Sequence, residues 1–172
     1  MGKVIPYFGR GWPGTVSRSV DDIIVSLKNT GGSEIPYGAP VFLDNNGDGV
    51  VGFTVNGSQT FEKFVGFAVR VADKTPDTYP AGQDMNIHYG SQQGAWKSGD
   101  VIEVLVRGSI VVAANNGFLN GGKVYIRKND GRLVPSAGAE GSTVLLENVR
   151  VRSLQTAMNN SIEVVVTERN IQ

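Results

Sequence analysis

The sequence predicts an all-β protein: a single antiparallel β-sandwich or β-barrel-like domain with an extended N-terminal arm. Segments of strand character recur roughly every 10 to 20 residues, and each is bounded by Gly, Asn, Asp or Pro. No window of about 12 residues shows the apolar stripe of an amphipathic helix. The 172 residues include 23 Gly and only 19% charged residues, which also argues against a helical protein.

The clearest strand lies in the segment Lys97–Val112. By the two-residue strand period, one face carries Ile102, Val104, Val106, Ile110 and Val112, whereas Glu103 and Arg107 lie on the other. The turn 98–100 leads into this strand. Gly108 interrupts it, and we expect a bulge or a close backbone approach there. The segment carries no chemistry, which indicates a scaffold.

The remaining strands are shorter. Residues 41–55 predict a hairpin around an Asn- and Asp-rich turn, and residues 129–131 predict a second hairpin turn. Residues 64–71 have little polarity on either face, so we expect a buried strand. A short turn of helix is an alternative for residues 149–158. Strands are predicted at 23–27, 41–43, 50–55, 64–71, 123–128, 132–134, 144–151 and 162–167.

Residues 1–19 predict the arm, and residues 20–172 predict the β domain. Gly and Pro punctuate the arm, so it cannot form a regular element alone. It carries aromatic and Arg side chains of the kind that anchor interfaces. The alternative is a terminus without a partner. The candidate partner-binding residues of the arm are Tyr7, Phe8, Arg10 and Trp12.

Composition argues against several functions. Sixteen Lys and Arg balance sixteen Asp and Glu, so we expect no nucleic-acid partner, and the zero net charge favours association. No apolar segment approaches the roughly 20 residues of a membrane span, so we expect no membrane partner. The N-terminus lacks the continuous apolar segment of a signal peptide, which predicts a soluble, unprocessed chain. The absence of Cys excludes disulfides and fits a reducing compartment.

Two motifs match binding sites by their letters. Residues 9–14 read G-x-G-x-x-G, but the dinucleotide site needs a strand before this motif and a helix after it, and neither is predicted. Residues 44–49 match the first half of a calcium loop, yet Val55 stands where the loop needs Glu. A turn that bonds its own backbone is favoured there, and calcium stays open. We expect no cofactor and no metal.

A catalytic centre is not predicted. His88 is the only histidine, and no Cys or second His could complete a site around it. Asp21 and Asp22 would point to opposite faces of a strand. A surface or structural role for His88 is favoured over a hydrolase. Other carboxylates that could act in a glycosidase are Asp73, Asp77, Asp84 and Asp100.

Residues 73–96 predict a loop with a binding role. Its aromatic residues Tyr79, Tyr89 and Trp96 stand among Gly, Gln and Asn, a composition typical of protein- or sugar-binding surfaces. The alternative is that these rings cover the edge of the β core. Loops on rigid β scaffolds commonly carry function, which favours binding.

Several short segments, in this order, resemble the structural cement, or head decoration, proteins of tailed bacteriophages. The resemblance covers roughly residues 23–135, and the last strand pair more loosely. The matching segments are Ile35-Pro36-Tyr37-Gly38-Ala39-Pro40-Val41, Phe64-Val65-Gly66-Phe67-Ala68, Ser98-Gly99-Asp100-Val101-Ile102-Glu103-Val104 to Gly108, Gly122-Lys123-Val124-Tyr125-Ile126 and Asp130-Gly131-Arg132-Leu133.

This resemblance implies a non-enzymatic virion protein on the capsid surface. Its partners would be the major capsid protein and itself, often as a homotrimer, and many repeated contacts would reinforce the head. The arm matches no pattern of that family. A carbohydrate- or protein-binding β-sandwich that uses the loop 73–96 is the alternative function, and a hydrolase centred on His88 ranks third.

Overall fold

The computed structural model describes residues 13–53, 63–71, 94–114, 117–154 and 161–168. This part of the chain confirms the all-β class, and within it no helix is long and apolar enough to cross a membrane. The eleven strands are β1 (Val16–Lys28), β2 (Ile35–Pro36), β3 (Pro40–Leu43), β4 (Val50–Val51), β5 (Phe64–Ala68), β6 (Ala95–Trp96), β7 (Val101–Ala113), β8 (Lys123–Arg127), β9 (Leu133–Val134), β10 (Thr143–Leu154) and β11 (Ser161–Val166).

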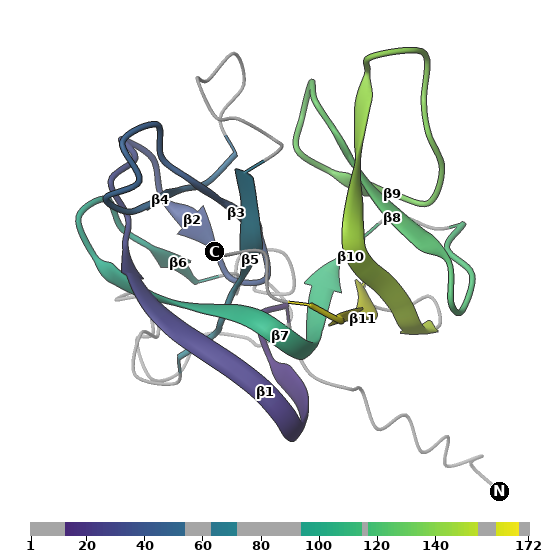
Figure 1. The fold of residues 1–172 in the computed structure, drawn as a ribbon, viewed down its shortest axis with the longest axis horizontal. Coiled ribbons are helices and arrows are strands. Elements are labelled where there is room, and N and C mark those ends of the chain that lie inside the picture. The colour runs from purple at the N-terminus through teal and green to yellow at the C-terminus, as the bar shows by residue number, and fades with distance from the viewer. Residues whose placement is uncertain (1–12, 54–62, 72–93, 115–116, 155–160, 169–172) are drawn as a thin grey trace, which may run out of the picture.

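β7 is the central strand of a nine-stranded antiparallel sheet (Figure 1). β1 pairs with most of its length. β5 pairs near the start of β7, where Phe67 stands opposite Leu105, and β11 pairs along its end, from Gly108 to Ala113. The sheet therefore divides at β7 into two branches, β5–β3–β4 and β11–β10–β8–β9.

The first branch curls into a half-barrel. An isolated bridge joins Asn29, which follows β1, to Val50 at the start of β4. Asn29 is fully buried, and its side-chain amide donates hydrogen bonds to the carbonyl oxygens of Ser33 and Lys97, both at 3.1 Å. β2 and β6 form a separate two-stranded sheet. The curl brings the end of β1 beside β4 at one rim.

The half-barrel separates two apolar cores. Val104 and Val106 of β7 belong to one, whereas Leu105 and Ile110 belong to the other. The sequence analysis placed Val106 and Ile110 on a single face. That prediction is wrong, because β7 passes from one branch of the sheet to the other between them. Both faces of β7 are therefore buried over most of its length.

Gly108 marks this transition. Its φ is 121°, a conformation that residues with side chains rarely adopt, and a Cβ atom there would overlap the carboxyl group of Asp22 on β1. The pairing of β1 with β7 shifts register around this point. The predicted bulge or close approach at Gly108 is confirmed.

Most predicted strands and turns are also confirmed. β3 and β4 form the first hairpin, β8 and β9 form the second, and all five residues of β5 are buried. β10 extends to Leu154, so residues 149–154 are strand rather than helix. β1 begins at Val16, so residues 16–19 of the predicted arm lie in a strand. Residues 1–12 lie outside the described part of the chain.

Candidate functional site

The predicted arm joins the domain at Pro13 and Gly14, which are both buried. The Gly14 amide donates a hydrogen bond to the carbonyl oxygen of Val111 (2.8 Å), and the Gly14 carbonyl oxygen accepts one from the amide of Arg70 (2.8 Å). Gly14 has a φ of 86°, and a Cβ atom there would lie 2.8 Å from the Cβ atom of Tyr37. Only glycine suits such a crowded, left-handed position. We call Pro13 and Gly14 the arm root, because the arm leaves the β domain at these two residues.

An aromatic pair lies beside the arm root. The rings of Tyr37 and Trp96 meet edge to face, with centroids 6.0 Å apart and planes at 88°. The Arg70 guanidinium lies 5.8 Å from the centroid of the Tyr37 ring. Burial raises the pKa of Tyr37, although the positive charge of Arg70 opposes this change. The pair stiffens the domain where the arm begins.

Trp96 is therefore a core residue rather than a surface contact. Its side chain is only 4% exposed, and its Nε1 donates a hydrogen bond to the carbonyl oxygen of Val69 (3.0 Å). The sequence analysis placed this ring in a partner-binding loop. The structure corrects that prediction, because β6 pairs with β2 and turns the indole into the core of the half-barrel.

The middle of β1 forms an elbow. Ser109 of β7 pairs with Arg18, and Arg107 pairs with Ile23, so one residue of β7 stands opposite four residues of β1. Figure 1 shows β1 folding back at this point, at the edge of the molecule. We call residues 19–24 the β1 elbow.

Hydrogen bonds fix the base of the β1 elbow. The amide of Ser109 donates to Oδ1 of Asp22 (3.3 Å), and Nη1 of Arg152 donates to the hydroxyl of Ser109 (2.7 Å). On the other side, the hydroxyl of Ser17 donates to Oε1 of the fully buried Glu163 (2.8 Å). The bonds of Asp22 and Ser17 therefore hold β1 to β7 and β11 at the base of the elbow.

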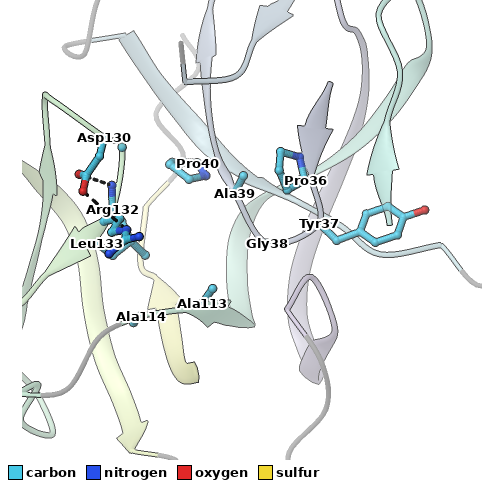
Figure 2. Close-up of a pocket in the computed structure, with 11 residues that line it drawn as sticks. Pro36, Tyr37, Gly38, Ala39, Pro40, Ala113, Ala114, Asp130, Arg132 and Leu133 are labelled. Atoms are coloured by element: carbon cyan, nitrogen blue, oxygen red, sulfur yellow. Dashed lines mark hydrogen bonds and ion pairs between the residues drawn. The ribbon is translucent and has the colours of Figure 1, made fainter. Parts of the chain in front are cut away.

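A pocket of about 350 Å³ opens between residues 36–40 and the β8–β9 turn (Figure 2). Its lining is mostly small or apolar, and Asp130 and Arg132 supply the charges. Figure 2 shows the Tyr37 ring pointing away from it. The described lining offers no histidine, serine or cysteine.

Asp130 is already committed to the turn that borders this pocket. Its Oδ1 accepts hydrogen bonds from Nε of Arg127 (2.9 Å) and from the amide of Arg132 (3.2 Å). The Arg127 guanidinium lowers the pKa of Asp130. A Cβ atom on Gly131 would collide with the ring of Phe53, which packs against the turn. Asp130 therefore stabilises the hairpin.

The turn that resembles half of a calcium loop bonds its own backbone. Oδ1 of Asp44 accepts a hydrogen bond from the amide of Asp48 (3.0 Å), and Oδ2 accepts one from the hydroxyl of Thr30 (2.9 Å). Within the described residues, no group of three or more acidic or His side chains could hold a metal ion. This geometry is the backbone-bonded turn that the sequence favoured.

Acid should weaken this turn. Loss of water around the Asp44 carboxyl opposes ionisation, but hydrogen bonds from Thr30 and from the amides of residues 47–49 outweigh it and lower the pKa below its usual 3.8. The ionised form therefore stabilises the fold fully above pH 3.8, and this contribution disappears as the pH falls through the lower folded-state pKa. We expect Asp44→Asn to reduce stability near pH 7, and the difference from the wild type to shrink as the pH falls below 3.8. Denaturant unfolding across this pH range measures the difference.

Asn46→Ala is the matched control for Asp44→Asn, because Asn46 lies in the same turn and does not titrate. It should leave the pH dependence of the wild type intact. The role of the Asp44 carboxylate would be contradicted if the difference in unfolding free energy between Asp44→Asn and the wild type stayed constant with pH.

A known protein family matches almost the whole chain. Residues 3–167 match the family described as Structural cement protein (E217 gp24/Pam3 gp6). The chain belongs to the phage structural cement protein family. This membership confirms the resemblance seen in the sequence, and it places the protein in the virion.

A solved structure shares the fold of this cement protein. One chain in "The capsid of Myoviridae Phage XM1" superposes with a TM-score of 0.65 at 16% sequence identity, and the match covers 97% of this chain and 96% of that chain. No curated protein sequence matches this cement protein. At 16% identity, the likeness establishes the shared fold.

Most predicted contact residues of this cement protein lie outside the described part of the chain. These are Tyr7, Phe8, Arg10 and Trp12 of the arm, and Tyr79 and Tyr89 of the loop. His88 lies outside it as well. The contact roles of these six residues stay predictions. After Gly14, the G-x-G-x-x-G motif continues into β1, where a dinucleotide site would need a helix.

Sequence reasoning missed the arm root and the β1 elbow. The signal for the elbow was present in the segment 21–24, which reads Asp-Asp-Ile-Ile. In an extended strand each pair places one residue on each face, so neither face can be wholly apolar. Such a segment fits a bend better than a flat, half-buried strand.

Proposed function

We propose that this cement protein binds the outer surface of an icosahedral phage head and stabilises contacts between major capsid protein subunits. The family match over residues 3–167 carries this proposal. The zero net charge, which favours association, supports it. We propose further that the protein acts as a homotrimer, has no enzymatic activity, and takes neither nucleic acid nor membrane as a partner.

The arm is the proposed contact element. The buried arm root anchors its start to β7 through the Gly14–Val111 hydrogen bond. A fixed start lowers the entropy lost when the arm binds, which favours affinity. Its anchor side chains would contact the capsid or a neighbouring copy, and Tyr79 and Tyr89 would add contacts from the loop. The carbohydrate-binding alternative has lost one of its three rings, since Trp96 is buried.

Deletion of residues 1–12 tests this proposal. The shortened chain keeps the arm root and all described strands, so we expect it to fold. It should bind undecorated phage heads at least about tenfold more weakly than the full chain, because each lost contact repeats across the lattice. Co-sedimentation with purified heads measures binding, and electron microscopy of the decorated heads shows where the protein sits.

Leu119→Ser is the control for this deletion, because Leu119 is 73% exposed and lies far from the arm in sequence. It should bind heads normally. The contact role of the arm fails if the deletion variant binds like the full chain. The cement function itself fails if the full chain neither binds undecorated heads nor raises the temperature at which they rupture.

A further inference from the structure

The β1 elbow exposes two adjacent apolar side chains. Ile23 and Ile24 are 37% and 43% exposed. The pairing of β1 with β7 shifts register between them, so both belong to the bend. Elsewhere in the described part of the chain, the exposed large apolar residues Val101 and Leu119 stand singly. Adjacent exposed isoleucines on a projecting bend suggest a contact surface.

The same elbow contains a carboxylate oxygen that lacks a hydrogen bond. Oδ1 of Asp22 is bonded to the amide of Ser109, whereas Oδ2 is buried and has no partner in the described part of the chain. An unpaired buried acceptor is destabilising. Asp21 beside it is exposed. Because Oδ2 lies below the surface, a cation from another molecule would meet the charges of Asp21 and Asp22 without bonding Oδ2.

The arm has the complementary chemistry. The first 20 residues of the chain contain no Asp or Glu. Within the arm, two cations flank a run of apolar and aromatic side chains, which suits a surface of paired carboxylates and isoleucines. The residues concerned are Lys3, Val4, Ile5, Tyr7, Phe8 and Arg10.

We propose that residues 1–12 of one copy bind the β1 elbow of a neighbouring copy. The cations of the arm face Asp21 and Asp22, and its apolar side chains cover Ile23 and Ile24. This inference rests on the proposed contact role of the arm and names its receptor. Repeated from copy to copy, such a head-to-tail contact forms a ring where the rotation between copies closes.

Single cysteines test the contact directly, because the natural chain has none. A Tyr7→Cys chain and an Ile24→Cys chain, carrying different tags, are co-expressed and mildly oxidised. We expect a covalent dimer that joins residue 7 of one chain to residue 24 of the other, identified by mass spectrometry. The yield should be at least about tenfold above that of the matched pair with Leu119→Cys, whose position is more exposed.

Two outcomes overturn the inference. One is a yield no higher than that of the Leu119→Cys pair. The other is a Tyr7→Cys, Ile24→Cys double variant that links only within single chains. Head binding of the unsubstituted chain is measured separately. Cross-linking of the variants without head binding by the unsubstituted chain would sink the cement proposal alone. Head binding by the unsubstituted chain without cross-linking would sink this inference alone.

A charge exchange provides a second test that leaves the base of the elbow intact. Asp21→Lys should weaken self-association at low salt by about tenfold, measured by analytical ultracentrifugation, and the loss should shrink at high salt. Adding Arg10→Asp to the same chain should restore association. Unchanged association of Asp21→Lys, or no recovery in the double variant, contradicts the proposed pairing.

Discussion

Gly108→Ala is expected to destabilise the fold by about 3–5 kcal/mol. Two costs combine in this substitution. The φ of 121° is strained for any residue with a Cβ atom, and the new methyl group would collide with the carboxyl group of Asp22. Relief of the collision would push β1 away from the centre of β7, where both branches of the sheet meet. Urea unfolding measured by intrinsic fluorescence gives the free energy of unfolding.

Gly99→Ala separates the two costs. Gly99 also has a positive φ, of 84°, but a Cβ atom there would meet nothing within 4 Å. Its substitution should cost only about 1–2 kcal/mol, from backbone strain alone. Asp22→Ala combined with Gly108→Ala should recover the part of the loss that is due to collision. Equal costs for Gly99→Ala and Gly108→Ala would show that the approach of Asp22 does not restrict residue 108.

Trp96→Ala is expected to cost about 3–5 kcal/mol, because a large buried ring is removed from the core of the half-barrel. The change also leaves the carbonyl oxygen of Val69 without its indole donor, and it removes the edge-to-face partner of Tyr37. The same urea unfolding assay measures this loss.

Trp96→Phe distinguishes a core role from a contact role. Phenylalanine keeps much of the packing but loses the hydrogen bond to Val69, so we expect a loss of about 1–2 kcal/mol. Binding to undecorated heads should stay at the wild-type level at temperatures where this variant is folded. If a stably folded Trp96→Phe protein bound heads more weakly, Trp96 would have a contact role as well as a core role.

The strands and turns were predictable because their signals are local. Alternating apolar residues in β7, the apolar segment of β5, and Asn129-Asp130-Gly131 between β8 and β9 can each be recognised within a few residues. The family could also be recognised, because the matching segments follow one another in a set order. The arm root was harder to find, since the need for glycine at residue 14 arises from Tyr37 and Arg70.

Trp96 shows why the contact surface was not predictable as a whole. Its neighbours in sequence are Gly, Gln and Lys, which favour a surface loop. Its neighbours in space are Tyr37 and Val69, which the pairing of β2 with β6 brings together. The elbow raises the same difficulty, because the exposure of Ile23 and Ile24 depends on how β1 crosses Gly108.

The sequence alone determined the all-β class, the family and the importance of β7, since these depend on residue pattern and order. The tertiary structure decided which core each residue of β7 enters, that Trp96 is buried, and that Asp22, Ile23 and Ile24 meet on a projecting bend. The physical reason is that burial and hydrogen bonding depend on strands that are distant in the chain. Their arrangement follows from the curl of the sheet and the division of its branches at β7.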